Sequence, residues 1–78
     1  MNKQDRKQLE EYREQIEGIQ ADIEEMKDNE DEKLSNLEDR NIYDGELHEN
    51  LEAARDSLEY VYDNLQEALD NIDEILSM

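Results

Sequence analysis

The side chains in this sequence that could do chemistry are mostly carboxylates. Its 78 residues include 25 Asp and Glu but only one histidine, His48, and no cysteine. Hydroxyl groups come only from Ser35, Ser57, Ser77 and four tyrosines, and no nucleophile–base triad, phosphate loop or GxGxxG motif is present. We therefore expect a protein that is not an enzyme and that binds no cofactor.

Two arrangements resemble metal sites, and both fail on their spacing. A di-metal carboxylate bundle needs Glu-x-x-His pairs, but the residue three before His48 is Gly45. Residues 28–34 resemble the start of a calcium loop, but Lys33 occupies the position where that loop needs glycine. We expect a solvated helical charge run there, no metal site, and a histidine at the edge of the core beside Glu52.

Carboxylates and one tyrosine in the second half form the strongest candidate binding surface. The acids recur at steps of one to four residues, so acid rows repeat about every 5 Å along a helix. Duplex DNA carries about one charge per 1.7 Å, and two or more such rows approach that density over one face. The candidate partner-binding residues are Glu49, Glu52, Asp56, Glu59, Tyr60, Asp63, Glu67, Asp70, Asp73 and Glu74.

The composition of the second half favours a functional role for this surface. Residues 46–78 carry 10 acids and a single base, Arg55, so the Glu–Lys pairs that usually stabilise exposed helices are largely missing. We expect Tyr60 to be exposed among the acids as an anchor for a partner. A purely solubilising role for the acids stays open as the alternative.

Apolar residues at helical spacing must position these side chains. Four heptads of the second half place aliphatic residues at a and d, in the order Leu51, Ala54, Leu58, Val61, Leu65, Ala68, Ile72 and Ile75. The first half repeats the pattern with Leu9, Tyr12, Ile16, Ile19, Ile23 and Met26. Because the chain has no proline and only two glycines, long helices meet few breakers.

The pattern predicts a single all-α domain, residues 1–78, folded as an antiparallel helical hairpin. We expect one helix at about residues 3–38, a loop at about 39–45 and a second helix at about 46–77. A short loop between helices of similar length makes them antiparallel neighbours.

Capping residues refine the expected ends of the two helices. Asn2 suits the N-cap of the first helix, and Asp44 or Asn41 suits that of the second. The apolar pattern of the first helix fades between Asp28 and Glu32, so we expect fraying or a kink there.

A second copy of the chain is expected to complete the core. Tyr62, Leu69 and Leu76 lie beside the a/d stripe and widen the apolar face beyond what a two-stranded pairing needs. A lone hairpin of this size has a marginal core. We therefore predict a homodimeric four-helix bundle.

The net charge of −17 restricts the possible partners. It disfavours direct binding of nucleic acid or an anionic membrane and favours a basic protein surface. No apolar run reaches the length of a membrane span, and the first residues are not followed by an apolar signal core. Together with the absence of cysteine, this leads us to expect a cytoplasmic protein.

Two stretches carry a resemblance to known proteins. The run Asp28-NEDEKLSNL, followed by Glu49-NLEAARDSLEYVYDNLQEALDNIDEIL, resembles small acidic two-helix proteins of Gram-positive bacteria and their mobile elements. The resemblance implies a helical hairpin and no particular functional residues. By charge density, the chain also resembles the DNA-mimic inhibitors that phages and plasmids encode.

Two functional hypotheses follow from these features. In the first, the protein is an acidic, DNA-mimic-like inhibitor that occupies a basic, nucleic-acid-binding surface of a partner. In the second, it is a structural or adaptor coiled-coil module that pairs with another helical protein through its apolar stripe.

Overall fold

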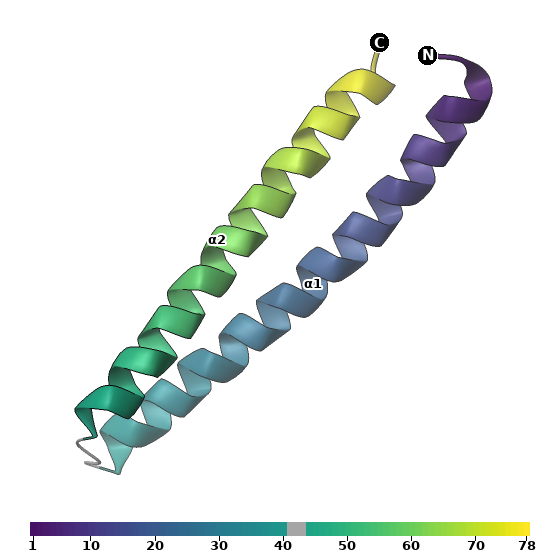
Figure 1. Ribbon diagram of the computed structural model, residues 1–78. Coiled ribbons are helices and arrows are strands. Elements are labelled where there is room, and N and C mark those ends of the chain that lie inside the picture. Colours follow the sequence, from purple (N-terminus) through teal and green to yellow (C-terminus); the bar gives the residue numbers. More distant parts are fainter. Residues whose placement is uncertain (41–43) are drawn as a thin grey trace.

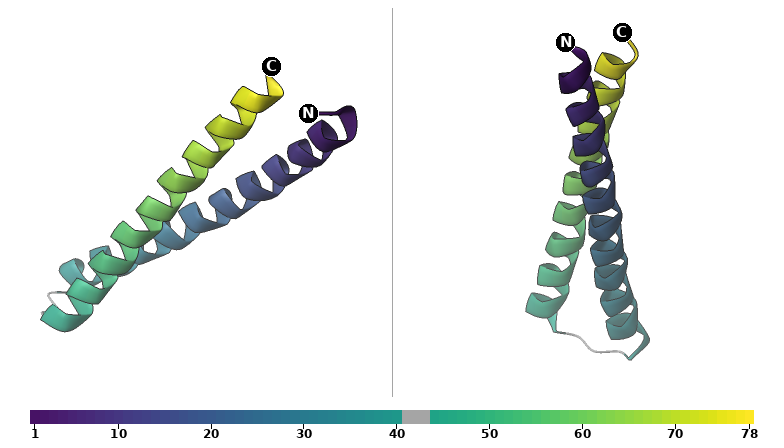
Figure 2. Two further views of the ribbon diagram at one scale, coloured as in Figure 1. Left: turned by 45° about the horizontal axis from the view of Figure 1, so that its top comes forward. Right: turned by 90° about the vertical axis from the view of Figure 1, so that its right-hand side faces the viewer.

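Two long helices make up the protein. The computed structural model describes residues 1–40 and 44–78 and contains α1, Lys3–Asp39, and α2, Gly45–Leu76 (Figure 1). The helices pack antiparallel in a rod of 58 × 15 × 14 Å. Both run the length of the molecule, and the chain termini lie at the same end (Figure 2). The predicted all-α antiparallel hairpin is confirmed.

Polar caps begin both helices. The Asn2 side chain accepts a hydrogen bond from the backbone N–H of Asp5 at 2.7 Å. The Asp44 side chain accepts one from the backbone N–H of Leu47 at 3.1 Å. These bonds satisfy N–H groups that have no partner inside the helix, which confirms the caps expected at Asn2 and Asp44. Asn41, the other proposed cap, lies outside the described residues.

The expected kink in the first helix was wrong. α1 continues without interruption through Asp28–Glu32, where the apolar pattern fades. Neither proline nor glycine interrupts this stretch, and the Lys33 ammonium lies 2.9 Å from the Glu30 carboxylate one turn earlier. The next turn is anchored by Leu34, which is 5% exposed. Intact backbone hydrogen bonds and this anchor keep the helix regular.

The seam between the helices, meaning the side chains that α1 and α2 bury against each other, differs from the predicted stripe. On α2 it consists of Leu51, Arg55, Leu58, Tyr62, Leu65, Leu69, Ile72 and Leu76. On α1 it consists of Arg6, Leu9, Arg13, Ile16, Gln20, Ile23, Lys27, Glu30, Leu34 and Leu37. Both sets alternate steps of three and four residues, which is the spacing of a two-stranded coiled coil.

Four of the fourteen predicted core positions are exposed and therefore wrong. Tyr12, Ile19 and Met26 were assigned to the core, but between 50% and 55% of each is exposed. The following residues, Arg13, Gln20 and Lys27, occupy the seam instead. On α2 the assigned d residue Val61 is exposed and the other three d residues are half-buried, as are most of the residues one position later. Leu69, which is 2% exposed, is the most buried of these.

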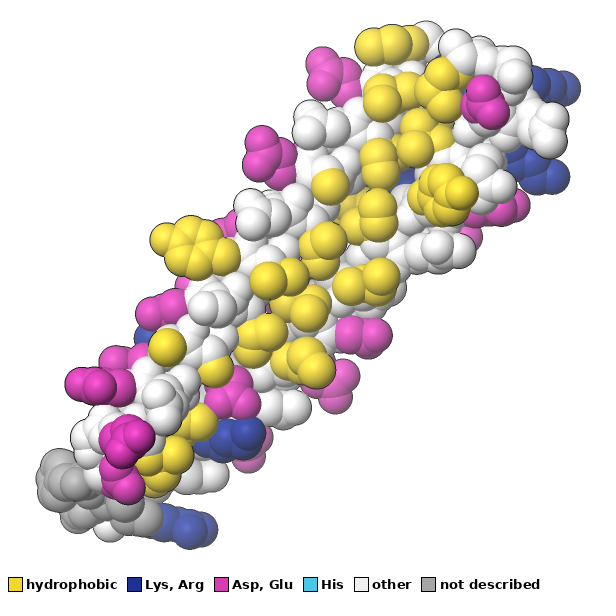
Figure 3. All heavy atoms as spheres, viewed as in Figure 1, with side chains coloured by type: hydrophobic (Ala, Val, Ile, Leu, Met, Phe, Trp, Pro, Cys, Tyr) yellow, Lys and Arg dark blue, Asp and Glu magenta, His cyan; other side chains and the backbone are white. Residues whose placement is uncertain are grey.

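The seam divides the hairpin into two contrasting flanks. One, here called the apolar flank, consists of Tyr12, Ile19, Met26, Leu47, Ala54, Val61, Ala68 and Ile75. Hydrophobic side chains form a continuous band over both helices on this side (Figure 3). The opposite side, here called the acidic flank, consists of Glu10, Glu17, Glu24, Asp31, Glu52, Glu59 and Asp73. In each helix the apolar-flank residues lie on one side of the seam residues and the acidic-flank residues lie on the other, and both sets repeat every seven residues.

Candidate functional site

The centre of the predicted acidic surface is a shallow hollow on α2. Asp56, Glu59, Tyr60 and Asp63 line this hollow, which has a volume of about 310 Å³. Tyr60 is 71% exposed, as expected for a tyrosine available to a partner. Consecutive steps of three and four residues bring the three carboxylates onto one side of the helix, about 5 Å apart along its axis. An aromatic face surrounded by carboxylates can accept a Lys or Arg side chain.

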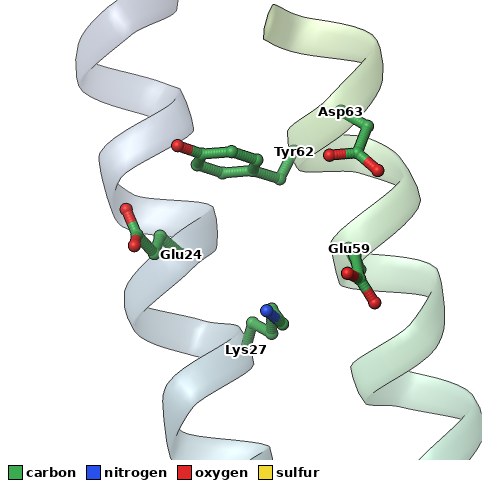
Figure 4. A pocket seen from close by; sticks show the side chains of 5 residues that line it. All are labelled: Glu24, Lys27, Glu59, Tyr62 and Asp63. Carbon is green, nitrogen blue, oxygen red and sulfur yellow. The ribbon is translucent and has the colours of Figure 1, made fainter.

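A second hollow continues this surface across the seam to α1. It is lined by Glu24, Lys27, Glu59, Tyr62 and Asp63 and has a volume of about 160 Å³. The Tyr62 ring extends from α2 toward α1, and the two glutamates lie on opposite helices (Figure 4). Because both hollows share Glu59 and Asp63, they form one continuous surface.

Sequence reasoning missed the contribution of α1 to this surface. Glu10, Glu17, Glu24 and Asp31 recur every seven residues, so they follow one line along the helix. That repeat was visible in the sequence. Its position next to the acids of α2 depends on which residues of α1 enter the seam, and this register was predicted incorrectly.

One predicted partner-binding residue is already engaged inside the hairpin. The guanidinium of Arg13 donates two hydrogen bonds to the Asp73 carboxylate, and the Nη2–Oδ2 pair is 3.2 Å apart. Arg13 also binds Glu17, with Nη1 and Oε2 2.8 Å apart. The hydrogen bond from Arg13 lowers the pKa of Asp73, and the same bond raises the pKa of Arg13. Asp73 thus links the two helices, and Arg13 already neutralises the charge that it would present to a partner.

Arg55 is the only base of α2 and lies beside the hollow around Tyr60. Its Nη2 is 3.2 Å from Asp56, and its Nε is 3.6 Å from Asp31 on α1. The hydrogen bond to Asp56 raises the pKa of Arg55. Arg55 neutralises one edge of the acidic surface, whereas Glu59 and Asp63 lie in the hollow that Lys27 of α1 also lines.

The single histidine lies at the edge of the hairpin, as expected. Its Nδ1 is 3.8 Å from Glu52 on the same helix, and its Nε2 is 3.9 Å from Glu38 on α1. Glu52 is thereby drawn toward the seam and is half-buried. Across residues 1–40 and 44–78, no three His, Asp or Glu side chains gather in an arrangement that would hold a metal ion.

The remaining predicted residues extend the surface along the outside of α2. Glu49, Glu67, Asp70 and Glu74 are exposed, and Asp70 accepts a hydrogen bond of 3.0 Å from Gln66. The structure therefore brings four of the ten predicted residues into one hollow and distributes the others along the same helix. The usable surface is a strip of charge with one aromatic contact at its centre.

Comparison with protein-family models, curated proteins and solved structures finds no significant match for this chain. Within the described part of the chain, neither helix is long and apolar enough to cross a membrane. Function must therefore be inferred from the two flanks, their charges and their contacts.

Proposed function

We propose that this protein is a non-enzymatic, acidic protein-binding module that occupies a basic, nucleic-acid-binding surface of a partner protein. The observation that supports this most is the joined surface of carboxylates from both helices around the exposed ring of Tyr60. In this role the protein is a DNA-mimic-like inhibitor that acts in the cytoplasm. It contacts the partner protein and not the nucleic acid.

Electrostatics would bring the two proteins together. A net charge of −17 on a rod 58 Å long creates an extended negative potential. Such a field raises the association rate with a positively charged surface and repels nucleic acid. A groove that accommodates a DNA backbone already presents cations at intervals that suit regularly spaced carboxylates.

Short-range contacts would centre on the hollow around Tyr60. A lysine or arginine of the partner can lie over the tyrosine ring, where the cation–π interaction adds to its attraction to Glu59 and Asp63. An arginine can also donate two parallel hydrogen bonds to one carboxylate. The hollow therefore favours a protruding basic side chain over a flat neutral surface.

The functional unit we propose is a homodimeric four-helix bundle. The apolar flank supports this, because Tyr12, Ile19 and Met26 are each at least half exposed on a chain with few apolar residues. Since the acidic flank lies on the opposite side of the seam, a second hairpin can cover the apolar flank and leave the acidic surface accessible.

Capture of proteins from a native lysate at two salt concentrations tests the proposed function. At low salt we expect the protein to retain nucleic-acid-binding proteins, and we expect duplex DNA to compete for them. Near 0.15 M salt, where charges are screened beyond about 8 Å, retention should fall steeply. Retention that salt and DNA leave unchanged would contradict the proposal.

The alternative function is a structural or adaptor module that pairs with a different helical protein. The exposed apolar flank favours it, since such a band is also what a partner helix would cover. The two functions differ in which flank they need. Val61→Ser and Ile19→Ser should abolish partner binding by an adaptor, whereas the inhibitor should still bind its basic partner when both copies are present at high concentration.

A further inference from the structure

The hairpin by itself exposes more surface than its mass warrants. Its accessible area is 6024 Å², whereas a compact monomer of 9.3 kDa exposes about 5,000 Å². Only Leu34 and Leu69 among the described hydrophobic residues are buried. The five most exposed large hydrophobic residues away from the chain ends, other than Tyr60, are all on the apolar flank: Tyr12, Ile19, Met26, Leu47 and Val61.

The apolar flank is also kept free of charge on the acidic helix. α2 contains 10 carboxylates, yet none lies on this flank or in the adjoining row of Asn50, Ser57, Asn64 and Asn71. A surface that remains in water has no need to exclude charge from two neighbouring rows of such a helix. The exclusion is what burial against another protein surface requires, because unpaired buried charges are costly.

The size of the flank matches a protein interface. The molecule is 58 Å long and 15 Å wide, so this side offers roughly 900 Å². Each partner in a stable interface of standard size contributes about 800 Å². The flank is therefore large enough to hold a second hairpin along its whole length.

The apolar-flank residues of α1 suit pairing with a second, antiparallel copy of α1. On this side α1 presents Asp5, Tyr12, Ile19, Met26 and Lys33, each seven residues after the last. If two copies of α1 lie antiparallel with Ile19 facing Ile19, then Tyr12 faces Met26 and Asp5 faces Lys33. Apolar residues then meet apolar residues, and the charges at the two ends are opposite. Lys33, which pairs with Glu30 within α1, is exposed.

The same two-fold axis also aligns α2. Gln20 contacts both Tyr62 and Gln66 across the seam, so the level of Ile19 falls near Asn64 on α2. An axis at that level, between Asn64 and Leu65, makes Val61 face Ala68 and brings Asn64 close to its own copy. The uncharged rows of α2 thus face the same rows of α2 in the second copy, and beside them α1 faces α1 of the second copy.

Charge distribution selects the head-to-tail orientation. The half that holds the termini, residues 1–20 and 66–78, carries nine acids and four bases, whereas residues 21–65 carry sixteen acids and four bases. Two copies with their loops at the same end would place both strongly acidic halves side by side. The opposite orientation places each strongly acidic half beside the weakly charged half of its partner.

We infer that the apolar flank binds a second copy of this chain head to tail, with the two-fold axis at the level of Ile19 and an intermolecular ion pair between Asp5 and Lys33. This inference rests on the proposed homodimer and adds its interface, orientation and register. Such a dimer is isologous and closed, so it buries the apolar band without leaving a surface for further growth. The acidic flanks then face away from each other and form two equivalent partner sites.

Disulfide crosslinking tests the arrangement directly, because the sequence contains no cysteine. Oxidised Ile19→Cys should form a covalent dimer within minutes, since two-fold symmetry brings each residue to its own copy. Tyr12→Cys is the matched control, being 50% exposed against 52% for Ile19, and alone it should stay uncrosslinked. An equal mixture of Tyr12→Cys and Met26→Cys should again form dimers.

Other crosslinks or masses would overturn the inference. Crosslinking of Ile19→Cys to Ala68→Cys in a mixture, without Ile19 homodimers, would place the loops at the same end. A wild-type mass of about 9.3 kDa by light scattering at micromolar concentration would show that no second copy binds. Binding to a basic partner is measured separately through the acidic flank, so failure of the dimer and failure of the proposed function give different results.

Discussion

Gln20 of α1 and Gln66 of α2 are joined across the seam by a hydrogen bond of 2.9 Å from the amide Nε2 of Gln20 to Oε1 of Gln66. Gln20 also lies 3.4 Å from the backbone carbonyl of Tyr62, and it is only 6% exposed. A polar residue buried in a coiled-coil seam fixes the alignment of the helices at a cost in stability. This pair therefore sets the level at which α1 and α2 meet.

Replacing this buried amide with a hydrocarbon should stabilise the hairpin. Gln20→Leu removes a desolvated polar group and fills the same volume, so the free energy of unfolding should rise by about 1 kcal/mol. Gln66 stays partly in water and is not left as a buried unpaired group. Urea unfolding followed by circular dichroism measures the change. Gln66→Ala is the contrasting variant, because it removes the acceptor of the buried Gln20 amide and should lower the free energy of unfolding. A loss of stability in Gln20→Leu would show that the hydrogen bonds outweigh the hydrocarbon.

Removing charge from the acidic surface should weaken partner binding strongly and leave the fold intact. The triple variant Asp56→Asn, Asp63→Asn and Asp70→Asn keeps the side-chain shapes and removes three charges. Each lost ion contact at a partly desolvated interface is worth about 1 kcal/mol, so affinity should fall by roughly a hundredfold in a binding titration.

A matched variant separates this surface from net charge in general. Glu11→Gln, Glu25→Gln and Glu32→Gln also remove three charges, but from the exposed outer side of α1. This variant should lose only a few-fold in affinity through the weaker long-range field. Equal losses in the two triple variants would contradict a localised site.

Tyr60 should contribute to binding without contributing to stability. Its ring is 71% exposed and lies among Asp56, Glu59 and Asp63. Tyr60→Ala should weaken binding of the basic partner about tenfold, the loss of roughly 1.4 kcal/mol expected for an aromatic contact in an interface. The thermal unfolding midpoint should stay unchanged. Tyr62→Ala is the contrasting variant, because it empties a seam position and should lower that midpoint.

The ion pair between the helices predicts a specific pH dependence. Because Arg13 lowers the pKa of Asp73 in the folded protein, this carboxylate stabilises the fold above the ordinary aspartate pKa and loses that effect as the pH falls through its lowered value. Asp73→Asn should therefore be less stable than wild type at pH 7 and equal to it in strong acid.

Thermal unfolding of both proteins across that range checks the prediction. Glu67→Gln, a change at an exposed carboxylate on the outer side of α2, controls for the general loss of negative charge. It should not reproduce the pH-dependent difference. A constant difference between wild type and Asp73→Asn at all pH values would mean that the carboxylate acts through packing alone.

The ends of the helices were predictable from local chemistry. The side chains of Asn2 and Asp44 each accept a hydrogen bond from the backbone N–H three residues later, so these caps depend only on the neighbouring sequence. The predicted helices at about 3–38 and 46–77 differ from α1 and α2 by one residue at the shifted ends. Continuity through Asp28–Glu32 was underestimated, because a weak apolar pattern was given more weight than the absence of any helix breaker.

The register of the seam was not predictable in the same way. Apolar residues on α1 occupy two columns, meaning rows of residues seven apart: the column of Ile16 and the column of Ile19. The column of Ile16 gives a three–four repeat with the column of Ile19 and equally with the column of Gln20. The prediction assigned both columns of α1 to the core. The structure buries Gln20 next to Ile16 and leaves Ile19 half exposed.

Sequence by itself determined two helices, their caps, their lengths and the excess of carboxylates on α2, because each depends on residues within a few positions of one another. Tertiary structure alone decided which columns face the seam. Tyr62 and Leu69 fill the space between the helices better than Val61 and Ala68, which precede them. The long stems of Arg13 and Lys27 can line that space while their charges reach water or an acid of α2. Burial of these columns rotates both helices relative to the predicted core stripe, and it places the apolar flank and the acidic flank on opposite sides of the seam.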